Sequence, residues 1–529
     1  FFQKGMFTKM NKIKIFDSTL RDGAQGEGVS FSVEDKLAVV QYLDDLGVDY
    51  IEGGNPTSNP KDCEFFNRVS GLTLKNAKIV SFTSTHKIGG DPEKDVSLNA
   101  VLDTKTEYVS VFGKSWDMQV TDILNANLEQ NLEIIESTIS YLTKKGQKVF
   151  FDAEHFLDGY KANVEYAMQT LNSALKSGAK ALILCDTNGA CFPFEVEEIV
   201  TEVAKKFPNI EIGIHTHNDT GMAVANAISA VRGGATHIQG TFGGFGERCG
   251  NMDLCTAIPN LQLKLGYDCI PQSSMQFLTE TARSVAEAAN IGLDPRTPYV
   301  GSSAFAHKGG MHSDAVIKKS ASYEHITPDT VGNSRRVLMS EVAGRSAILL
   351  ALKSIDPSID RNSEQTKKVL EKLKELEHSG YEFEGAEGSL EILIRKELGR
   401  FEPHFGLDKF NVVVNEPSEG HSSIAAVKIF VDGVHEMSAA EGEGPVNALD
   451  TAIRRALGVF YPELKKMSLV DYKVRVLGSN DGTASKVRVL ITSTNGNKTW
   501  RTVGVSADII DASWKALVDS IEYYLGTIR

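Results

Sequence analysis

The sequence lacks the features that mark several other classes of protein. Its six cysteines show no Cys-X-X-Cys spacing, so we expect no disulfide framework but reduced thiols in the cytoplasm. No apolar run approaches the ~20 residues of a membrane span. The formal net charge is −13 and no Arg/Lys stripe offsets it, which argues against a nucleic-acid partner. The remaining composition, 41% hydrophobic and 24% charged, is that of an ordinary soluble enzyme.

The first half of the chain alternates between strand-like and helical patterns. Helical patterns such as 33–46 and 128–144 separate eight strand-like runs. Eight strands within roughly 250 residues favour a closed (β/α)8 barrel over an open sheet. We therefore expect a catalytic TIM barrel over residues 11–285. The eight runs are 13–17, 50–54, 78–84, 108–113, 148–153, 181–186, 210–215 and 237–242.

Polar residues collect where the predicted strands end. Catalytic groups in this fold come from the carboxyl ends of the strands, so the pattern indicates one active site at that face. The residues concerned are Asp22, Glu52, Glu154, Thr187, His215, His217 and Asn251.

His215 and His217 predict half of a metal site. They end an apolar run at 210–214, and side chains at i and i+2 of a strand point to the same face. Imidazole suits a divalent transition metal, which a third oxygen ligand would complete. The alternative is a pair of histidines that cap the strand and bond locally.

Arg21 and Asp22 form a second polar cluster, at the mouth of the first predicted strand. Asp22 offers a carboxylate to a metal, and Arg21 offers a bidentate cation to an anionic substrate. A surface ion pair of little energetic value is the alternative.

The pattern changes after residue 285. We expect linker subdomains at 286–400, with a Gly/His-rich segment at 301–345 and a charged helix at 363–378. A strand-rich module follows at 405–529. It contains two β-then-α units, which indicate a pseudo-symmetric domain for small-molecule binding or dimerisation. Their strands and helices are expected at 425–431, 445–457, 486–491 and 507–525.

Three motifs together resemble the 2-isopropylmalate/homocitrate/citramalate synthase family. They are DSTLRDGAQ at 17–25, HTHND at 215–219 followed by GMAVAN at 221–226, and GERCGN at 246–251. The resemblance covers nearly the whole chain. It implies a metal-dependent TIM barrel that condenses acetyl-CoA with a 2-oxoacid, and a C-terminal amino-acid-sensing domain.

Two further tracts, 25–32 and 52–60, resemble the branch of the family that forms citramalate. That branch uses pyruvate and opens a threonine-independent route to isoleucine, which makes isoleucine the expected effector. The isopropylmalate branch, which uses 2-oxoisovalerate in leucine synthesis, has Gln-Ser-Pro-Gly where this chain differs; it remains the alternative.

The resemblance also implies roles for individual residues. Asp22, His215, His217 and Asn251 would hold Mn2+, Mg2+ or Zn2+. The other implied site residues are Arg21, Thr187 and Asp314 for substrate binding, and Arg21, Glu154, His312 and Tyr323 for catalysis. Asp314 is also placed to orient His312, and His312 and Tyr323 would come from the neighbouring subunit of a homodimer.

Other interpretations remain open. Glu154 could be a strand-end carboxylate paired with a lysine, and Tyr323 an ordinary interface tyrosine. The whole chain could be an acyl-CoA lyase on the same barrel, although a lyase would be expected to lack the C-terminal module. It could also be a non-catalytic amino-acid sensor, but a scaffold would need none of Arg21, Asp22 and His215.

Overall fold

The chain folds into two compact units. Unit 1 comprises residues 1–305 and 326–335, and unit 2 comprises 306–325 and 336–529. No helix in the part of the chain described here is long and apolar enough to cross a membrane. The computed structural model describes residues 11–57, 59–307, 312, 315–316, 318–337, 352, 355, 359, 363–383, 385–414, 423–477, 485–496 and 498–528.

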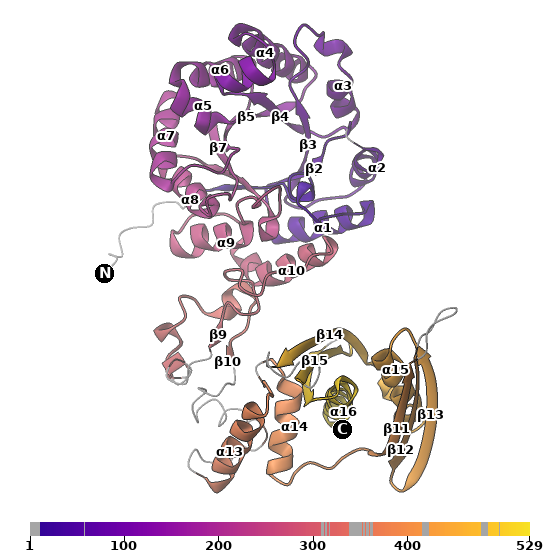
Figure 1. The fold of residues 1–529 in the computed structure, drawn as a ribbon. Helices are drawn as coiled ribbons and strands as arrows, with labels where there is room; N and C mark the ends of the chain where they lie inside the picture. The colour runs from indigo at the N-terminus through magenta and orange to yellow at the C-terminus, as the bar shows by residue number, and fades with distance from the viewer. Residues whose placement is uncertain are drawn as a thin grey trace. The chain divides into compact units, whose positions relative to one another are not determined.

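Unit 1 contains a closed barrel of eight parallel strands, which confirms the predicted fold class (Figure 1). The strands pair in sequence order, and β1 closes the barrel by pairing with β8. The strands are β1 (Lys14–Asp17), β2 (Tyr50–Gly54), β3 (Lys78–Ser84), β4 (Tyr108–Lys114), β5 (Lys148–Glu154), β6 (Ala181–Asp186), β7 (Glu211–Thr216) and β8 (His237–Gly240).

Helices surround the barrel, and local signals set their ends. Ser32 and Asp35 form a capping box that starts the first helix, and Gly47 ends it with φ 97°, a conformation that glycine adopts without strain. The helices are α1 (Val33–Leu46), α2 (Pro60–Val69), α3 (Val96–Asp103), α4 (Leu128–Lys144), α5 (Phe156–Ala162), α6 (Val164–Lys176), α7 (Pro193–Lys206), α8 (Ala223–Gly233), α9 (Leu254–Pro259) and α10 (Leu278–Ala288).

The barrel interior is built in two unlike layers. Rings pack against one another in an aromatic layer at the amino-terminal side, formed by Phe16, Tyr50, Tyr108, Phe150 and His237. Two residues further along each of these strands, the inward face carries buried polar groups instead. We call these the polar layer: Ser18, Glu52, Ser110, Asp152 and Gln239. This layer forms the floor of the site described below.

Unit 2 contains the predicted internal repeat, as two modules of three antiparallel strands and one helix. In the first module, α15 packs on β12 and β13; in the second, α16 packs on β15 and β16. Their elements are β11 (Gly406–Val414), β12 (Ser423–Val431), β13 (Val434–Gly442), α15 (Pro445–Leu457), β14 (Ser468–Leu477), β15 (Lys486–Thr494), β16 (Thr499–Ser506) and α16 (Ile509–Ile528). Further elements are β9 (Ala306–His307), β10 (Arg336–Val337), α13 (Glu364–His378) and α14 (Glu387–Glu397).

Candidate active site

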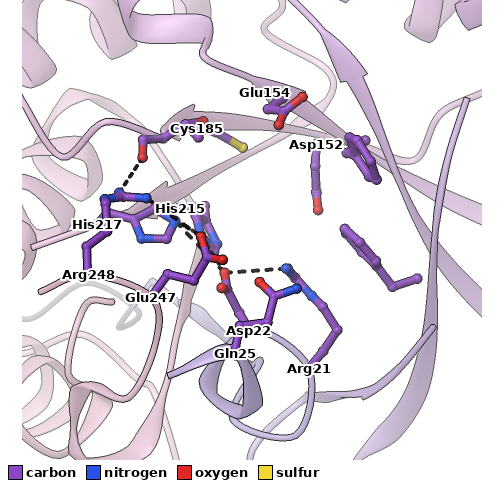
Figure 2. A pocket seen from close by; sticks show the side chains of 13 residues that line it. Arg21, Asp22, Gln25, Asp152, Glu154, Cys185, His215, His217, Glu247 and Arg248 are labelled. Carbon is purple, nitrogen blue, oxygen red and sulfur yellow. Dashed lines mark hydrogen bonds and ion pairs between the residues drawn. The ribbon is translucent and has the colours of Figure 1, made fainter. Parts of the chain in front are cut away.

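A cavity of about 220 Å³ opens at the carboxyl ends of the barrel strands (Figure 2). It gathers residues from loops and strands far apart in the sequence, as the strand-end pattern predicts. Its lining consists of Arg21, Asp22, Gln25, Phe82, Phe112, Asp152, Glu154, Cys185, Thr187, His215, His217, Glu247 and Arg248.

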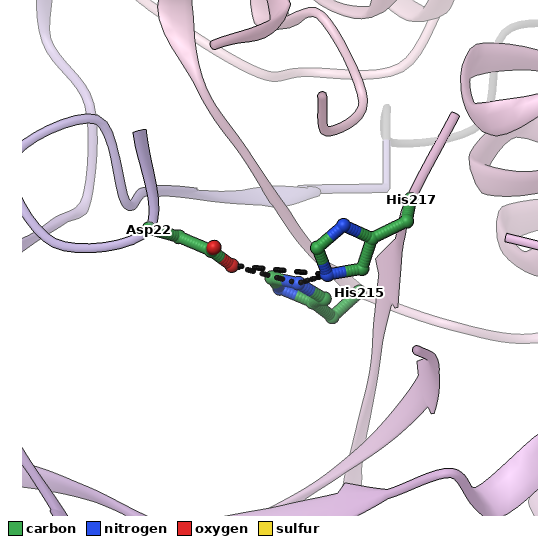
Figure 3. A group of neighbouring side chains, drawn as sticks. All are labelled: Asp22, His215 and His217. Atoms are coloured by element: carbon green, nitrogen blue, oxygen red, sulfur yellow. Dashed lines mark hydrogen bonds and ion pairs between the residues drawn. The ribbon is translucent and has the colours of Figure 1, made fainter. Parts of the chain in front are cut away.

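Asp22, His215 and His217 converge on one point (Figure 3). The Nε2 atoms of the two histidines lie 3.3 Å apart. Asp22 Oδ2 lies 3.2 Å from Nε2 of His215 and 4.0 Å from Nε2 of His217. The two histidines thus face the same side of β7, as their i, i+2 spacing predicts. Three ligand atoms so close together, all on buried residues, suit a single cation.

Asn251, the fourth ligand that the resemblance implies, lies beside His217. It pairs with His217 through an isolated antiparallel bridge, and it is 2% exposed. Its amide nitrogen donates to the carbonyl of Phe245 at 3.1 Å, whereas its Oδ1 has no hydrogen-bond partner among the described residues. A buried acceptor without a partner is costly, and a cation ligated there would satisfy it. The donor set of carboxylate, two imidazoles and amide oxygen fits a divalent metal.

The protonation states around this group also fit a cation. Burial alone would raise the pKa of Asp22, but Arg21 and His215 hold that pKa below its ordinary value. Burial and the neighbouring His215 lower the pKa of His217 to about 4. At neutral pH Asp22 is therefore an anion and His217 is neutral, and these are the forms that bind metals. Burial alone would lower the pKa of His215, but its contact with Asp22 raises that pKa above its ordinary value, so a cation would replace a proton there.

Arg21 is held rigidly beside Asp22. Its Nε donates to Glu52 Oε2 at 2.7 Å, and its Nη1 lies 3.4 Å from Asp22 Oδ2. The guanidinium lies 3.9 Å from the centre of the Phe82 ring. Glu52 is fully buried, so its charge is matched chiefly by this arginine. These contacts fix the Arg21 guanidinium at the cavity wall, where it could bind an anionic oxygen.

Glu154 and Thr187 lie on other strand ends of the same cavity. The Glu154 carboxylate forms an ion pair with Lys114 at 2.5 Å, which is the pairing considered from the sequence. The Thr187 hydroxyl oxygen accepts from the His155 backbone N–H at 2.8 Å, a bond that does not use the hydroxyl hydrogen. Both side chains keep atoms that face the cavity.

Asp152 also lines the cavity, although the sequence did not single it out. Burial and the nearby Glu52 raise the pKa of this carboxyl to about 7. Its place could have been found from the phase of β5, since it follows Phe150 of the aromatic layer by two residues.

The remaining predicted residues belong to unit 2 or lie outside the description. The rings of His312 and Tyr323 stack with their centres 4.2 Å apart. Tyr323 is half exposed, which leaves it open to contact from another surface. Asp314 lies outside the described residues.

Comparisons with known proteins match the whole architecture. The HMGL-like family matches residues 12–285, the homocitrate synthase post-HMGL domain-like family matches 299–380, and the LeuA allosteric (dimerisation) domain matches 384–525. The (R)-citramalate synthase of Aquifex aeolicus is 50% identical, over 97% of this chain and 98% of that protein. That of Synechocystis sp. is 46% identical, over 98% and 97%. A probable 2-isopropylmalate synthase of Methanopyrus kandleri is 31% identical, over 97% and 98%.

The chain therefore belongs to the HMGL-like family and, within it, groups with the (R)-citramalate synthases. This confirms the family and the branch that the motifs resemble.

Proposed function

We propose that this protein condenses acetyl-CoA with pyruvate and water to give (R)-citramalate and CoA. The observation that carries the proposal is the convergence of Asp22, His215 and His217 beside Arg21. The high identity to (R)-citramalate synthases over nearly the full chain supports the choice of substrates.

A divalent metal (Mn2+, Mg2+ or Zn2+) is proposed to bind through Asp22, His215, His217 and Asn251. When bound, it polarises the keto group of pyruvate and stabilises negative charge on the keto oxygen. The guanidinium of Arg21, fixed by Glu52, donates to the same oxygen as charge develops there. The Thr187 hydroxyl donates to the carboxylate of pyruvate.

Proton transfer is proposed to involve Glu154, His312 and Tyr323, and Glu154, which lines the cavity, is the candidate base tested first. The methyl group of acetyl-CoA is weakly acidic, so a positioned base is needed to remove its proton. The resulting carbon nucleophile forms a bond to the keto carbon, and the keto oxygen becomes the hydroxyl of the product. Water then cleaves the thioester, which releases CoA.

A neighbouring cavity of about 340 Å³ offers room for part of acetyl-CoA. It shares Arg21, Gln25 and Phe82 with the metal cavity, so the thioester could pass from one to the other. Lys36 and Lys61 also line it. Lys36 is already paired with Asp62, so Lys61 is the lysine of this lining whose charge could meet a phosphate of the substrate.

We propose that two copies of the chain associate. The match of 384–525 to an allosteric (dimerisation) domain supports this. In the dimer, His312 and Tyr323 of one copy complete the barrel site of the other, in keeping with the exposure of Tyr323.

The proposed effector of the C-terminal modules is isoleucine. A cavity of about 480 Å³ lies between α15 and β14. Asp450 and Arg454 line it among apolar side chains, and Nη2 of Arg454 is buried with no partner among the described residues. Arg454 Nε already donates to Asp450 Oδ1 at 2.8 Å, so Nη2 is the donor that could bind the carboxylate of an amino acid, and the apolar walls suit a branched side chain.

The deciding experiment measures thiol release with a panel of acceptors at saturating acetyl-CoA. We expect kcat/KM for pyruvate to exceed that for 2-oxoisovalerate. A pocket wall separates acceptors that differ by one methylene by only ~1–3 kcal/mol, so some activity on 2-oxobutanoate is expected. A ratio in favour of 2-oxoisovalerate would instead identify an isopropylmalate synthase. If no acceptor caused CoA release from acetyl-CoA, a lyase or a sensor would be favoured.

A further inference from the structure

The buried polar layer under the metal cavity is unusual for the interior of a TIM barrel. The interior of a TIM barrel is ordinarily filled by branched aliphatic side chains. Here Gln239 and Asp152 are 1% and 5% exposed, and each occupies an inward position where an apolar side chain would cost nothing to bury. Buried polar groups at such positions are retained where their hydrogen bonds do something specific.

Gln239 contacts the candidate metal ligand His215. The two residues are Cα partners in the pairing of β7 with β8. Gln239 Oε1 lies 3.1 Å from Nδ1 of His215, so Nδ1–H donates to the amide oxygen. A neutral imidazole carries one N–H, and with the hydrogen on Nδ1 the lone pair is on Nε2. That atom is the one that faces Asp22 and His217.

Asp152 determines which end of the Gln239 amide faces the histidine. Gln239 Nε2 donates to Asp152 Oδ1 over 3.5 Å, and the Ser110 hydroxyl donates to the same oxygen over 3.4 Å. If the amide were turned by half a rotation, its oxygen would face the carboxyl oxygen, and its NH2 would face the imidazole. That arrangement would favour the other tautomer, in which Nε2 carries the hydrogen and cannot bind a cation.

We propose that Asp152 and Gln239 form a positioning relay that holds His215 in the tautomer able to bind a divalent cation through Nε2. The inference rests on the proposed metal site. His217 has no such support, because its Nδ1 is buried with no hydrogen-bond partner among the described residues. The relay therefore makes His215 the better oriented of the two imidazole ligands.

The test is titration of the metal-free full-length protein with Mn2+ in a calorimeter. Gln239→Met keeps the side-chain length but removes the acceptor, and it should raise the Kd for Mn2+ about 10- to 100-fold. Asp152→Leu should also raise the Kd, because the amide loses the group that orients it. Asp152→Asn keeps an acceptor oxygen and should stay within about threefold of the wild type.

Controls separate the relay from general packing. Ile238 precedes Gln239 on β8, is fully buried and lies on the opposite face of that strand, so Ile238→Val should leave the Kd for Mn2+ unchanged. Thermal melting in EDTA shows whether each variant folds; if Gln239→Met does not, the comparison of Asp152→Leu with Asp152→Asn decides.

The outcomes distinguish the relay from the proposed function. Failure of the wild-type protein to bind Mn2+ would overturn the proposed metal site itself. Tight binding by the wild type, with equal affinity in Gln239→Met or equal effects of the two Asp152 substitutions, would overturn the relay alone.

Discussion

The Glu154 carboxylate and the Lys114 ammonium lie 2.5 Å apart at the ends of neighbouring strands, β5 and β4. Both side chains are partly buried, with 24% and 19% of their surface exposed. Glu154 lines the cavity and could act on a substrate there. Its contact with Lys114 is also what a purely structural ion pair would show. Substitution of each partner separates these roles.

If Glu154 removes the proton from acetyl-CoA, Glu154→Gln should lower kcat by about 10²- to 10⁴-fold, while KM for pyruvate changes little. Lys114→Met should cost far less, because the carboxylate remains. Exchange of the acetyl-CoA methyl hydrogens with deuterated water, followed by mass spectrometry, measures the step directly. An exchange rate equal to that of the wild type in Glu154→Gln would assign the proton to another residue.

Metal removal should abolish activity reversibly. Dialysis against EDTA followed by addition of Mn2+ is expected to remove and then restore thiol release. His217→Ala should lower metal occupancy and remove most activity, since a ligand is lost. His435→Ala changes a surface histidine of unit 2 that pairs with Asp408, and it serves as the control. Full activity of His217→Ala without bound metal would refute the metal-dependent chemistry.

Mixing two inactive variants tests whether the site is shared between subunits. An Asp22→Ala chain and a His312→Ala chain should each be inactive alone. A mixed dimer would contain one site with both residues intact, so random exchange should restore about one quarter of wild-type activity. Mixed dimers can be verified by mass spectrometry. Their complete inactivity would place both residues in a site built from one chain.

Isoleucine inhibition should depend on Arg454. Arg454→Met removes a charged donor from the cavity between α15 and β14, and a charged hydrogen bond contributes ~1.5–3 kcal/mol. The isoleucine concentration for half inhibition should rise at least about tenfold, with kcat and KM unchanged in its absence. Arg455, the next residue, donates to the Ala439 carbonyl, so Arg455→Met provides a matched control. Equal sensitivity in both variants would locate the effector elsewhere.

A buried carboxyl in unit 2 should make stability depend on pH. Burial raises the pKa of Asp519 to about 6, although Ser389 donates to it at 2.7 Å. A raised pKa means that the folded state favours the protonated acid, so the contribution of Asp519 to stability is greatest below about pH 4 and is lost as pH rises through 6. Asp519→Asn should therefore stabilise the protein at pH 7, by at most about 3 kcal/mol. Urea unfolding at pH 4 and pH 7 checks this, and an equal change at both would contradict it.

The sequence was informative about groups that act through local spacing. The i, i+2 step from His215 to His217 fixes their common face, and the alternation of strands and helices predicts the barrel. It was silent about Asp152 and Gln239, because their partners are brought together by strand pairing across the barrel. Only the phase of each strand relative to its inward aromatic residue could have indicated them. For Glu154, spacing alone could not separate a catalytic role from an ion pair with a lysine, which the structure shows to be Lys114.

The two ends of the barrel sequence meet at its proposed metal site. Asp22 follows the first strand, whereas His215 lies in the seventh and His217 directly after it, so nearly the whole barrel must be synthesised before the three ligands can converge. An ion bound there stabilises only the closed sheet and not a partly made one. Metal uptake would then be among the last events of folding. In a refolding experiment, metal binding would indicate that β1 has paired with β8 and closed the barrel.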